Sequence, residues 1–464
     1  MTYAGIVQSA VMAVGVVGLL LLVRIIVKSE PDRVIARLFV LGLLAKLAGS
    51  VARYTVMAEL YGGRADFRRY WRTGTELAGQ IRSGSLPEHA KQTGTAFMEF
   101  IAGVVYTVMP HTLWAGFLVF ALLSFVGMFL FLQAFRLAVP DGNHRLYAAL
   151  IFFSPTMVFW PSSMGKEAWL VFTLGVTSYG AARALKRAPF SYLLLALGGA
   201  GVFMVRPHMG ALIALAFAGS FLLRLRDPDI KKGIVGWVLG LVLVGLGAGY
   251  ALANFEDELP RDESVEGSPT EQVFAETERR TSQGGSAFDS RPVHSIGDFG
   301  HALITVPFRP FATEGHNIQA QVAGLEGTIL LLIFLLALPK LAALPRALLR
   351  KPYVAMATAY SIGFIIAFSN VGNFGILTRQ RAQLLPFLFV ILAFRWKRQR
   401  DERRPVLLPS TVDRQATIEP HALRPVAAYG NPDDVGRDLE HTRRPAELIV
   451  DLPAGVVQEP RPPP

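Results

Sequence analysis

Five short stretches of the sequence combine carboxylates, a histidine and basic side chains, the residue types that move protons and bind anions. They are residues 66–72, 161–167, 206–208, 309–314 and 379–381, and apolar runs lie between them. A carboxylate accepts a proton as a general base, and the planar guanidinium of arginine donates two hydrogen bonds at once to a phosphate. The combination indicates proton transfer beside a bound anion.

Asp66 and His208 are the candidate catalytic residues. Asp66 opens a basic, aromatic segment, where a carboxylate base would face a membrane-bound substrate. His208 carries the side chain that titrates closest to neutral pH. Each segment also has a plainer interpretation. Asp66 would then only pair with Arg68 or Arg69 on a solvated loop, and Arg206 would be an interfacial anchor.

A helix is predicted to begin near Gly165, with Ser162 or Ser163 as its N-cap. Its first free N–H groups and the positive end of its dipole would then lie beside Lys166 and form an anion site. The alternative is a capped helix whose lysine only reaches toward the membrane interface. The segment is not a Walker A loop, because Trp160 stands where the first glycine is needed.

The other candidates are side chains that would bind a lipid phosphate or another part of a substrate. Two of the arginines precede the last predicted membrane span, on the side where positive charge is disfavoured. The complete binding set is Arg68, Arg69, Lys166, Arg206, Arg309, Glu314, Arg379 and Arg381. No metal or other cofactor is predicted, since the chain has no cysteine and its histidines lack the spacing of a zinc motif.

Long apolar helices must carry these residues. Hydrophobic residues make up 52% of the 464 residues, charged residues only 17%, and the mean hydropathy is +0.38. A helix needs about 20 mainly apolar residues to cross a bilayer. We predict an all-α, polytopic membrane helix bundle. Its eleven predicted spans are approximately 5–25, 35–58, 113–135, 146–163, 167–184, 188–205, 209–225, 233–253, 326–344, 352–370 and 381–395.

Basic residues decide the predicted orientation, because short cytoplasmic loops are enriched in Lys and Arg. Every second loop is basic, which puts the N-terminus outside and the C-terminus in the cytoplasm. The alternation holds only if the apolar piece 96–109 does not cross, so we interpret it as an interfacial or re-entrant helix. The net charge of +11 then reflects topology, and no nucleic-acid partner is expected.

The chain divides into a transmembrane domain, 1–395, and a tail, 396–464, which is rich in Pro and Arg. We predict that the tail is disordered and cytoplasmic. Two outer loops are long. The first, 61–112, holds the re-entrant piece, and the second, 254–325, is predicted to be mobile and to close over an acceptor.

The pattern on the outer face resembles integral-membrane glycosyltransferases of the GT-C type and the related O-antigen polymerase and ligase class. Asp66 is similar in position to the catalytic acid of that family's outer loop, and segments 153–155 and 160–163 resemble the mid-chain spans of bacterial members. The resemblance implies sugar transfer or polymerisation from a polyprenyl-phosphate-linked donor. The arginines that match the lipid-phosphate ligands of the polymerases are Arg206, Arg309 and Arg381.

Three function classes stay open at this point. The first is a transferase or polymerase in a bacterial plasma membrane, which builds cell-envelope polysaccharide with membrane lipids, a lipid-linked sugar donor and a glycan acceptor as partners. The second is a transporter or flippase for a lipid-linked or anionic solute. It needs ionisable residues at membrane depth, and Lys46, Arg53 and a possible partner, Glu99, qualify. The third is a non-catalytic membrane scaffold that docks through its tail.

Overall fold

A computed structural model describes residues 3–60, 66–222, 288, 291–293, 295–315 and 318–395. Every helix or strand assigned in these ranges is a helix. The predicted span 233–253, most of the loop 254–325 and the tail 396–464 lie outside the described residues.

The first half of the described chain contains ten α-helices, and the sixth and seventh of them are short. A π-helical turn, Thr55–Leu60, extends the second helix, and 3-10 turns follow at Glu88–Lys91 and Trp160–Ser162. The helices are α1 (Tyr3–Ser29), α2 (Arg33–Tyr54), α3 (Asp66–Arg82), α4 (Thr95–Val108), α5 (Leu113–Ala138), α6 (His144–Phe153), α7 (Pro155–Phe159), α8 (Lys166–Leu185), α9 (Ser191–Val205) and α10 (Pro207–Leu222).

The second half of the described chain is also helical, and its last long helix lies deep in the bundle. Nearly all of α19 is buried, and it contacts α5, α6, α7, α8, α14, α15 and α18. The helices are α14 (Ile296–Phe308), α15 (Ile318–Leu336), α16 (Leu338–Leu341), α17 (Leu344–Arg350), α18 (Pro352–Phe368) and α19 (Phe374–Ala393).

Five described helices are long and apolar enough to cross a membrane. The pair α17 and α18, bent by 119°, counts as a sixth if it forms one span. The predicted total of eleven and the orientation of the termini stay predictions. The five segments are Met12–Ser29, Arg33–Met57, Leu113–Ala138, Ile318–Leu336 and Phe374–Ala393.

The predicted span 146–163 is not one helix. The chain breaks at Ser154, whose φ and ψ of −58° and 124° are extended, and resumes as the short helix α7 at Pro155. Proline disfavours helical geometry in the residue before it and is well placed at a helix start. The apolar run therefore becomes α6, α7 and a 3-10 turn.

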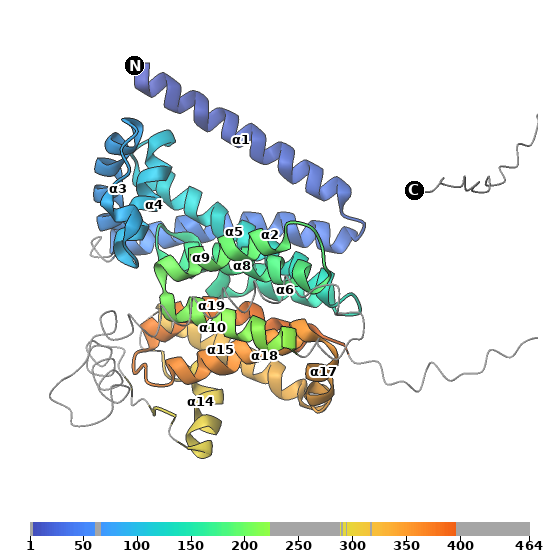
Figure 1. Ribbon diagram of the computed structural model, residues 1–464. Helices are drawn as coiled ribbons and strands as arrows, with labels where there is room; N and C mark the ends of the chain where they lie inside the picture. Colours follow the sequence, from blue (N-terminus) through green and yellow to red (C-terminus); the bar gives the residue numbers. More distant parts are fainter. Residues whose placement is uncertain are drawn as a thin grey trace, which may run out of the picture. The chain divides into compact units, whose positions relative to one another are not determined.

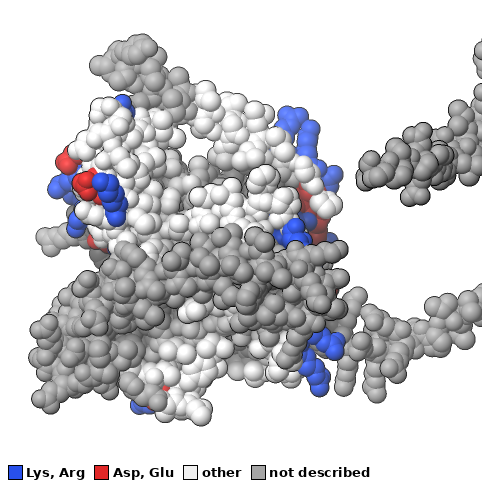
Figure 2. Space-filling view, in the orientation of Figure 1, with Lys and Arg blue, Asp and Glu red and all other residues white. Residues whose placement is uncertain are grey.

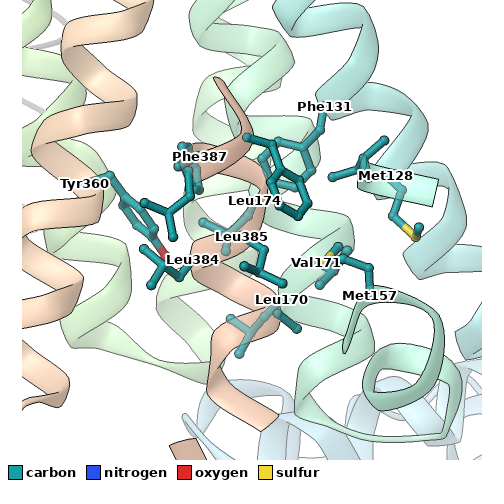
Figure 3. Packing of buried hydrophobic residues seen from close by; sticks show 14 of the residues in the cluster. Met128, Phe131, Met157, Leu170, Val171, Leu174, Tyr360, Leu384, Leu385 and Phe387 are labelled. Carbon is teal, nitrogen blue, oxygen red and sulfur yellow. The ribbon is translucent and has the colours of Figure 1, made fainter. Parts of the chain in front are cut away.

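The bundle forms because apolar faces of α2, α5, α8 and α9 pack side by side, while α3 lies across one end (Figure 1). Side chains from α5, α7, α8, α18 and α19 meet in the core, with Phe131 edge-on to Phe387 and Tyr360 tilted against the same ring (Figure 3). On the face shown in Figure 2, Lys, Arg, Asp and Glu gather at the two ends, and the described residues between them are uncharged.

Helices α5 and α8 approach so closely that glycine is required on both. A Cβ on Gly127 would meet the carbonyl oxygen of Val171, and a Cβ on Gly175 would meet the carbonyl oxygen of Gly127. Small residues let helix backbones approach in this way inside membranes.

Replacing Gly175 with leucine is therefore expected to destabilise the protein by about 1–3 kcal/mol or more, because backbone atoms cannot move aside as a side chain would. Gly199, on α9, has open space around its Cβ position and provides the matched Gly199→Leu control. Equilibrium unfolding in detergent micelles measures both. Equal stability of the two variants would contradict the close α5–α8 contact.

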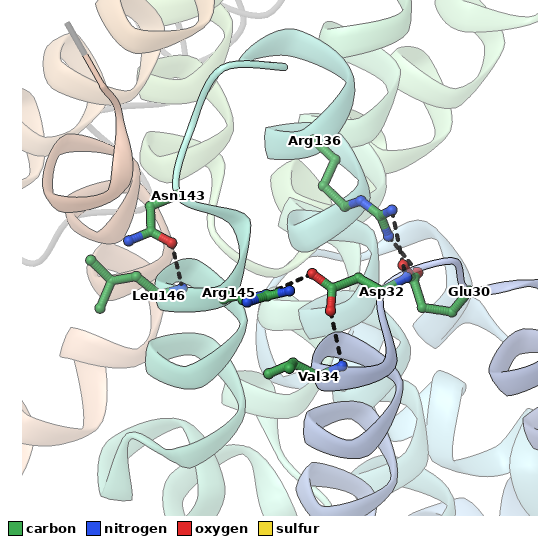
Figure 4. A network of polar contacts seen from close by, with 7 residues as sticks. All are labelled: Glu30, Asp32, Val34, Arg136, Asn143, Arg145 and Leu146. Carbon is green, nitrogen blue, oxygen red and sulfur yellow. Dashed lines mark hydrogen bonds and ion pairs between the residues drawn. The ribbon is translucent and has the colours of Figure 1, made fainter.

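Ion pairs tie the helix connections at one end of the bundle (Figure 4). Arg136 donates to Glu30 at 2.6 Å, and Arg145 donates to Asp32 at 2.8 Å. Asp32 also caps α2 by accepting the N–H of Val34, and its hydrogen bond from Arg145 lowers the pKa of Asp32. Two basic residues of a predicted cytoplasmic loop, Arg136 and Arg145, thus have carboxylate partners in the neighbouring connection.

At the other end, α3 and α4 form a packed pair. The buried face of α3 consists of Phe67, Tyr70, Gly74, Leu77 and Ala78. Arg82 fastens the pair by donating to the carbonyl oxygens of Tyr106 and Thr107. Helix α4 has 14 residues, fewer than the roughly 20 that a full crossing needs, which agrees with an interfacial or re-entrant piece.

Candidate functional site

The centre of the candidate site is Glu167, in the first turn of α8. Its side chain is buried, and two arginines from other helices surround it. Arg379 Nε of α19 lies 3.1 Å from Glu167 Oε1, and Arg206 Nη2, from the α9–α10 connection, lies 3.7 Å from the same oxygen. Arg206 also donates to Gln380 Oε1. One carboxylate thus joins α8 to both remote arginines.

The first turn of α8 has no side-chain cap. Its N-cap residue is Gly165, and the predicted cap Ser162 instead donates to the carbonyl oxygen of Val158. The prediction that Ser162 or Ser163 caps this helix is therefore wrong, because Ser162 ends a 3-10 turn and two further residues precede the N-cap Gly165. The uncapped N–H groups and the helix dipole favour a negative group at this point.

Lys166 extends this positive region. Its side chain is half-buried, and Nζ lies near Gly94, the residue before α4. No hydrogen bond or ion pair of Nζ is formed with any residue in the described ranges. Burial, followed by the positive charge of Arg206, lowers the pKa of Lys166. Among the residues that the structure describes, Lys166 is thus a cation of the site without a hydrogen-bond partner.

Asp66 begins α3, and its side chain is exposed. Its negative charge acts on Tyr70, Lys166 and Arg379, so the carboxylate lies within electrostatic range of the Glu167 group. Burial, and then the charges of Asp66 and Glu167, raise the pKa of Tyr70. Tyr70 is a buried neighbour that the sequence analysis did not select.

The plainer interpretation of Asp66, a pair with Arg68 or Arg69, is not what forms. Arg69 Nε pairs instead with Glu99 at 2.5 Å, and Glu99 Oε2 lies 3.5 Å from His89. Arg68 is exposed. The structure therefore brings neither of these two predicted binding residues into the Glu167 group.

His208 lies in the first turn of α10, directly after Arg206 and Pro207. Desolvation by surrounding protein, together with the positive charges of Arg206 and Lys166, lowers the pKa of His208, although its ring stays accessible to solvent. Its imidazole is neutral at neutral pH and so able to accept a proton.

Arg309 and Glu314 form a second cluster. Arg309 Nε donates to Glu314 Oε1 at 2.9 Å, and its guanidinium lies 4.6 Å from the ring centre of Phe288 and 5.1 Å from that of Phe374. Partial burial opposes ionisation of Glu314, but hydrogen bonds from Arg309 and the N–H of Phe311 outweigh it and lower the pKa of Glu314. Arg309 and Glu314, both predicted as binding residues, are therefore paired with each other.

Arg381 was predicted beside Arg379 in an outer loop, and that prediction is wrong. Helix α19 begins at Phe374 after the cap Asn373, so both arginines lie within the helix. Two residues turn an α-helix by about 200°, which directs Arg381 away from the Glu167 group. It is fully buried and donates to the carbonyl oxygen of Arg309.

The basic residues of α2 have partners other than the expected Glu99. Lys46 is fully buried and donates to the carbonyl oxygen of Met157 at 2.8 Å. The guanidinium of Arg53 lies over the rings of Phe159 and Trp160, 4.9 and 4.4 Å from their centres. Both side chains therefore lie against the α7 segment and not against α4.

The sequence analysis missed a buried carboxylate, Glu326 of α15. It accepts hydrogen bonds from Ser154 and Thr156 at the start of α7. The sequence could have pointed to Glu326, because it is an acidic residue at the edge of an apolar run and a charge at membrane depth needs a partner. Within the described ranges, no three His, Asp or Glu side chains gather closely enough to hold a metal ion.

Comparison with known proteins does not identify a family for this chain. No family model, no curated protein and no solved structure matches this chain. The chemistry therefore has to be argued from the site, where a carboxylate, an ammonium, two arginines and a neutral imidazole meet at three helix ends. Such a group combines a proton acceptor with a binding region for an anion.

Proposed function

We propose that this protein transfers a sugar from a polyprenyl-phosphate-linked donor to a glycan acceptor on the outer face of a bacterial plasma membrane. The observation that supports this most is the convergence of Asp66, Lys166, Arg206 and Arg379 from four separate segments. The proposed outer face is the end of the bundle where α3 lies (Figure 1).

In the proposed reaction, Asp66 accepts the proton of an acceptor hydroxyl while the hydroxyl oxygen bonds to the sugar's anomeric carbon. The bond from that carbon to the donor phosphate breaks, and the lipid phosphate leaves with the electron pair. Lys166 and the positive end of the α8 dipole stabilise the growing negative charge. Glu167 holds Arg206 and Arg379 in place beside them.

His208 offers a second arrangement of the same chemistry. Its neutral ring lies next to Arg206, as expected for a polymerase-like enzyme in which arginine and histidine lead and Asp66 is structural. Transport of an anionic solute is the alternative function, and the buried Lys46 and Glu326 are the observation that favours it, because such residues mark pathways through membranes.

The testing experiment is a profile of lipid-linked glycans and envelope polysaccharide in a deletion strain. The strain is complemented with the wild-type gene, with Asp66→Asn, and with Glu76→Gln, an exposed carboxylate on the same helix as a control. We expect loss of one glycan with build-up of its lipid-linked precursor, and restoration by wild type and Glu76→Gln only. An unchanged profile in the deletion strain would contradict sugar transfer. If Asp66→Asn restores the glycan, Asp66 is not the base, and His208 becomes the proposed proton acceptor.

A further inference from the structure

Two buried charges from different helices bind the backbone of the short helix α7 at the consecutive residues Thr156 and Met157. At its start, the Glu326 carboxylate accepts the N–H of Thr156 at 3.0 and 3.1 Å and the hydroxyls of Thr156 and Ser154. At the next residue, the Lys46 ammonium donates to the carbonyl oxygen of Met157, and helix carbonyl groups point toward the C-terminal end. Glu326 and Lys46 are 5% and 0% exposed, so water does not replace these bonds.

The charges match the polarity of the helix. A carboxylate at a helix start and an ammonium near its end are both stabilised by the helix dipole. A five-residue helix is not stable by itself, because helix nucleation is unfavourable. The position of α7 therefore depends on α15 and α2, the two helices that supply Glu326 and Lys46.

The chain between α7 and the candidate site is also fastened. Gly49 of α2 lies against the carbonyl oxygen of Val158, where a Cβ would collide. Arg53 covers the rings of Phe159 and Trp160, and Ser124 of α5 donates to the carbonyl oxygen of Pro161. Four residues after that proline, Gly165 leads directly into Lys166 and Glu167.

We infer that Glu326 and Lys46 are positioning residues: by holding the backbone of α7 from two sides, they set where Lys166 and Glu167 lie relative to Arg206 and Arg379. The two buried charges then need no transport pathway to explain them. The inference rests on the proposed function only for what Lys166 binds, since the positioning itself is a property of the fold.

The test uses the absence of cysteine from the chain, which makes any introduced thiol the only one. Lys166→Cys reports the position of the α8 start through its rate of reaction with a charged thiosulfonate. Ser220→Cys, buried in α10 and bonded within its own helix, reports general loosening. Each reporter is placed in the full-length protein with Glu326→Ala, Glu326→Gln or Lys46→Met. Thr358→Ala is the control, since it removes a buried hydroxyl that bonds only its own helix.

We expect Glu326→Ala and Lys46→Met to change the reaction rate of the Lys166→Cys reporter about tenfold, the effect of losing one or two buried hydrogen bonds. The rate of the Ser220→Cys reporter should stay within about twofold of that in the parent. Glu326→Gln keeps an oxygen for the Thr156 N–H and should restore most of the parental rate. Thr358→Ala should change neither rate.

Unchanged rates of the Lys166→Cys reporter in Glu326→Ala and Lys46→Met would overturn the inference. Equal increases at both reporters would also overturn it, because they indicate destabilisation of the whole bundle. If Glu326→Ala does not fold, Lys46→Met decides by the same comparison of the two reporters. Labelling needs no substrate, so a negative glycan profile for the deletion strain leaves this test intact, and failure here leaves the role of Asp66 intact.

Discussion

Replacing Glu167 with alanine is expected to lower the free energy of unfolding by about 3 kcal/mol. Removing one partner of a buried ion pair costs about 3–5 kcal/mol, because the remaining charge stays desolvated and unpaired. Here two arginines lose the same partner, but the side chain of Arg379 is 35% exposed and that of Arg206 12% exposed. Solvent reaching Arg379 places the expected effect at the lower end of that range.

Equilibrium unfolding of the purified protein in detergent micelles measures this effect. Glu76→Ala removes an exposed carboxylate on α3 and should change stability by no more than about 0.5 kcal/mol. A double-mutant cycle with Arg379→Gln should give a coupling of about 0.5–3 kcal/mol, as neighbours in one ion-pair network do. If Glu167→Ala and Glu76→Ala have the same free energy of unfolding, Glu167 does not hold the site together.

Asp66→Asn is expected to lower the turnover number for sugar transfer by about 10²–10⁴-fold, the usual contribution of a general base. Asparagine keeps the size of the side chain but cannot accept the proton. Asp66 is exposed and forms no hydrogen bond or ion pair with the residues that the structure describes. The free energy of unfolding of the variant should therefore lie within about 0.5 kcal/mol of that of wild type.

The measurement is single-turnover transfer from a short-chain polyprenyl-phosphate sugar by protein in membrane vesicles, with Asp66→Asn and Glu76→Gln compared at equal protein. Turnover should fall while half-saturation by the donor stays close to that of wild type, because the variant leaves the proposed phosphate-binding groups, Lys166 and the α8 terminus, unchanged. If Asp66→Asn keeps wild-type turnover and His208→Gln loses transfer, the imidazole of His208 is the group that accepts the proton.

Some features of the site follow from the sequence because they are local. Hydropathy predicts long apolar helices, and the described chain is helical with five segments long enough to cross a membrane. Loops on one side of a bundle end at the same face, which is why Asp66, Lys166, Arg206, His208 and Arg379 could be selected together. The sequence also predicted the helix start near Lys166, but it did not predict the N-cap residue correctly.

Other features depend on contacts that no local pattern encodes. Arg379 and Arg381 look equivalent in the sequence, yet the helical turn of about 200° between them sends one to Glu167 and the other into the core. Lys46 was expected near Glu99, but Glu99 pairs with Arg69 and Lys46 bonds the backbone of Met157.

The sequence by itself determined the helical class, the apolar segments and the set of polar residues from which a site is built. These depend on the hydropathy and residue types of neighbouring positions. Tertiary structure decided which carboxylate meets which arginine, and that Glu326 and Lys46 hold the break between α6 and α8. A buried charge is stable only beside a compensating group, and in this bundle that group comes from a helix distant in the sequence.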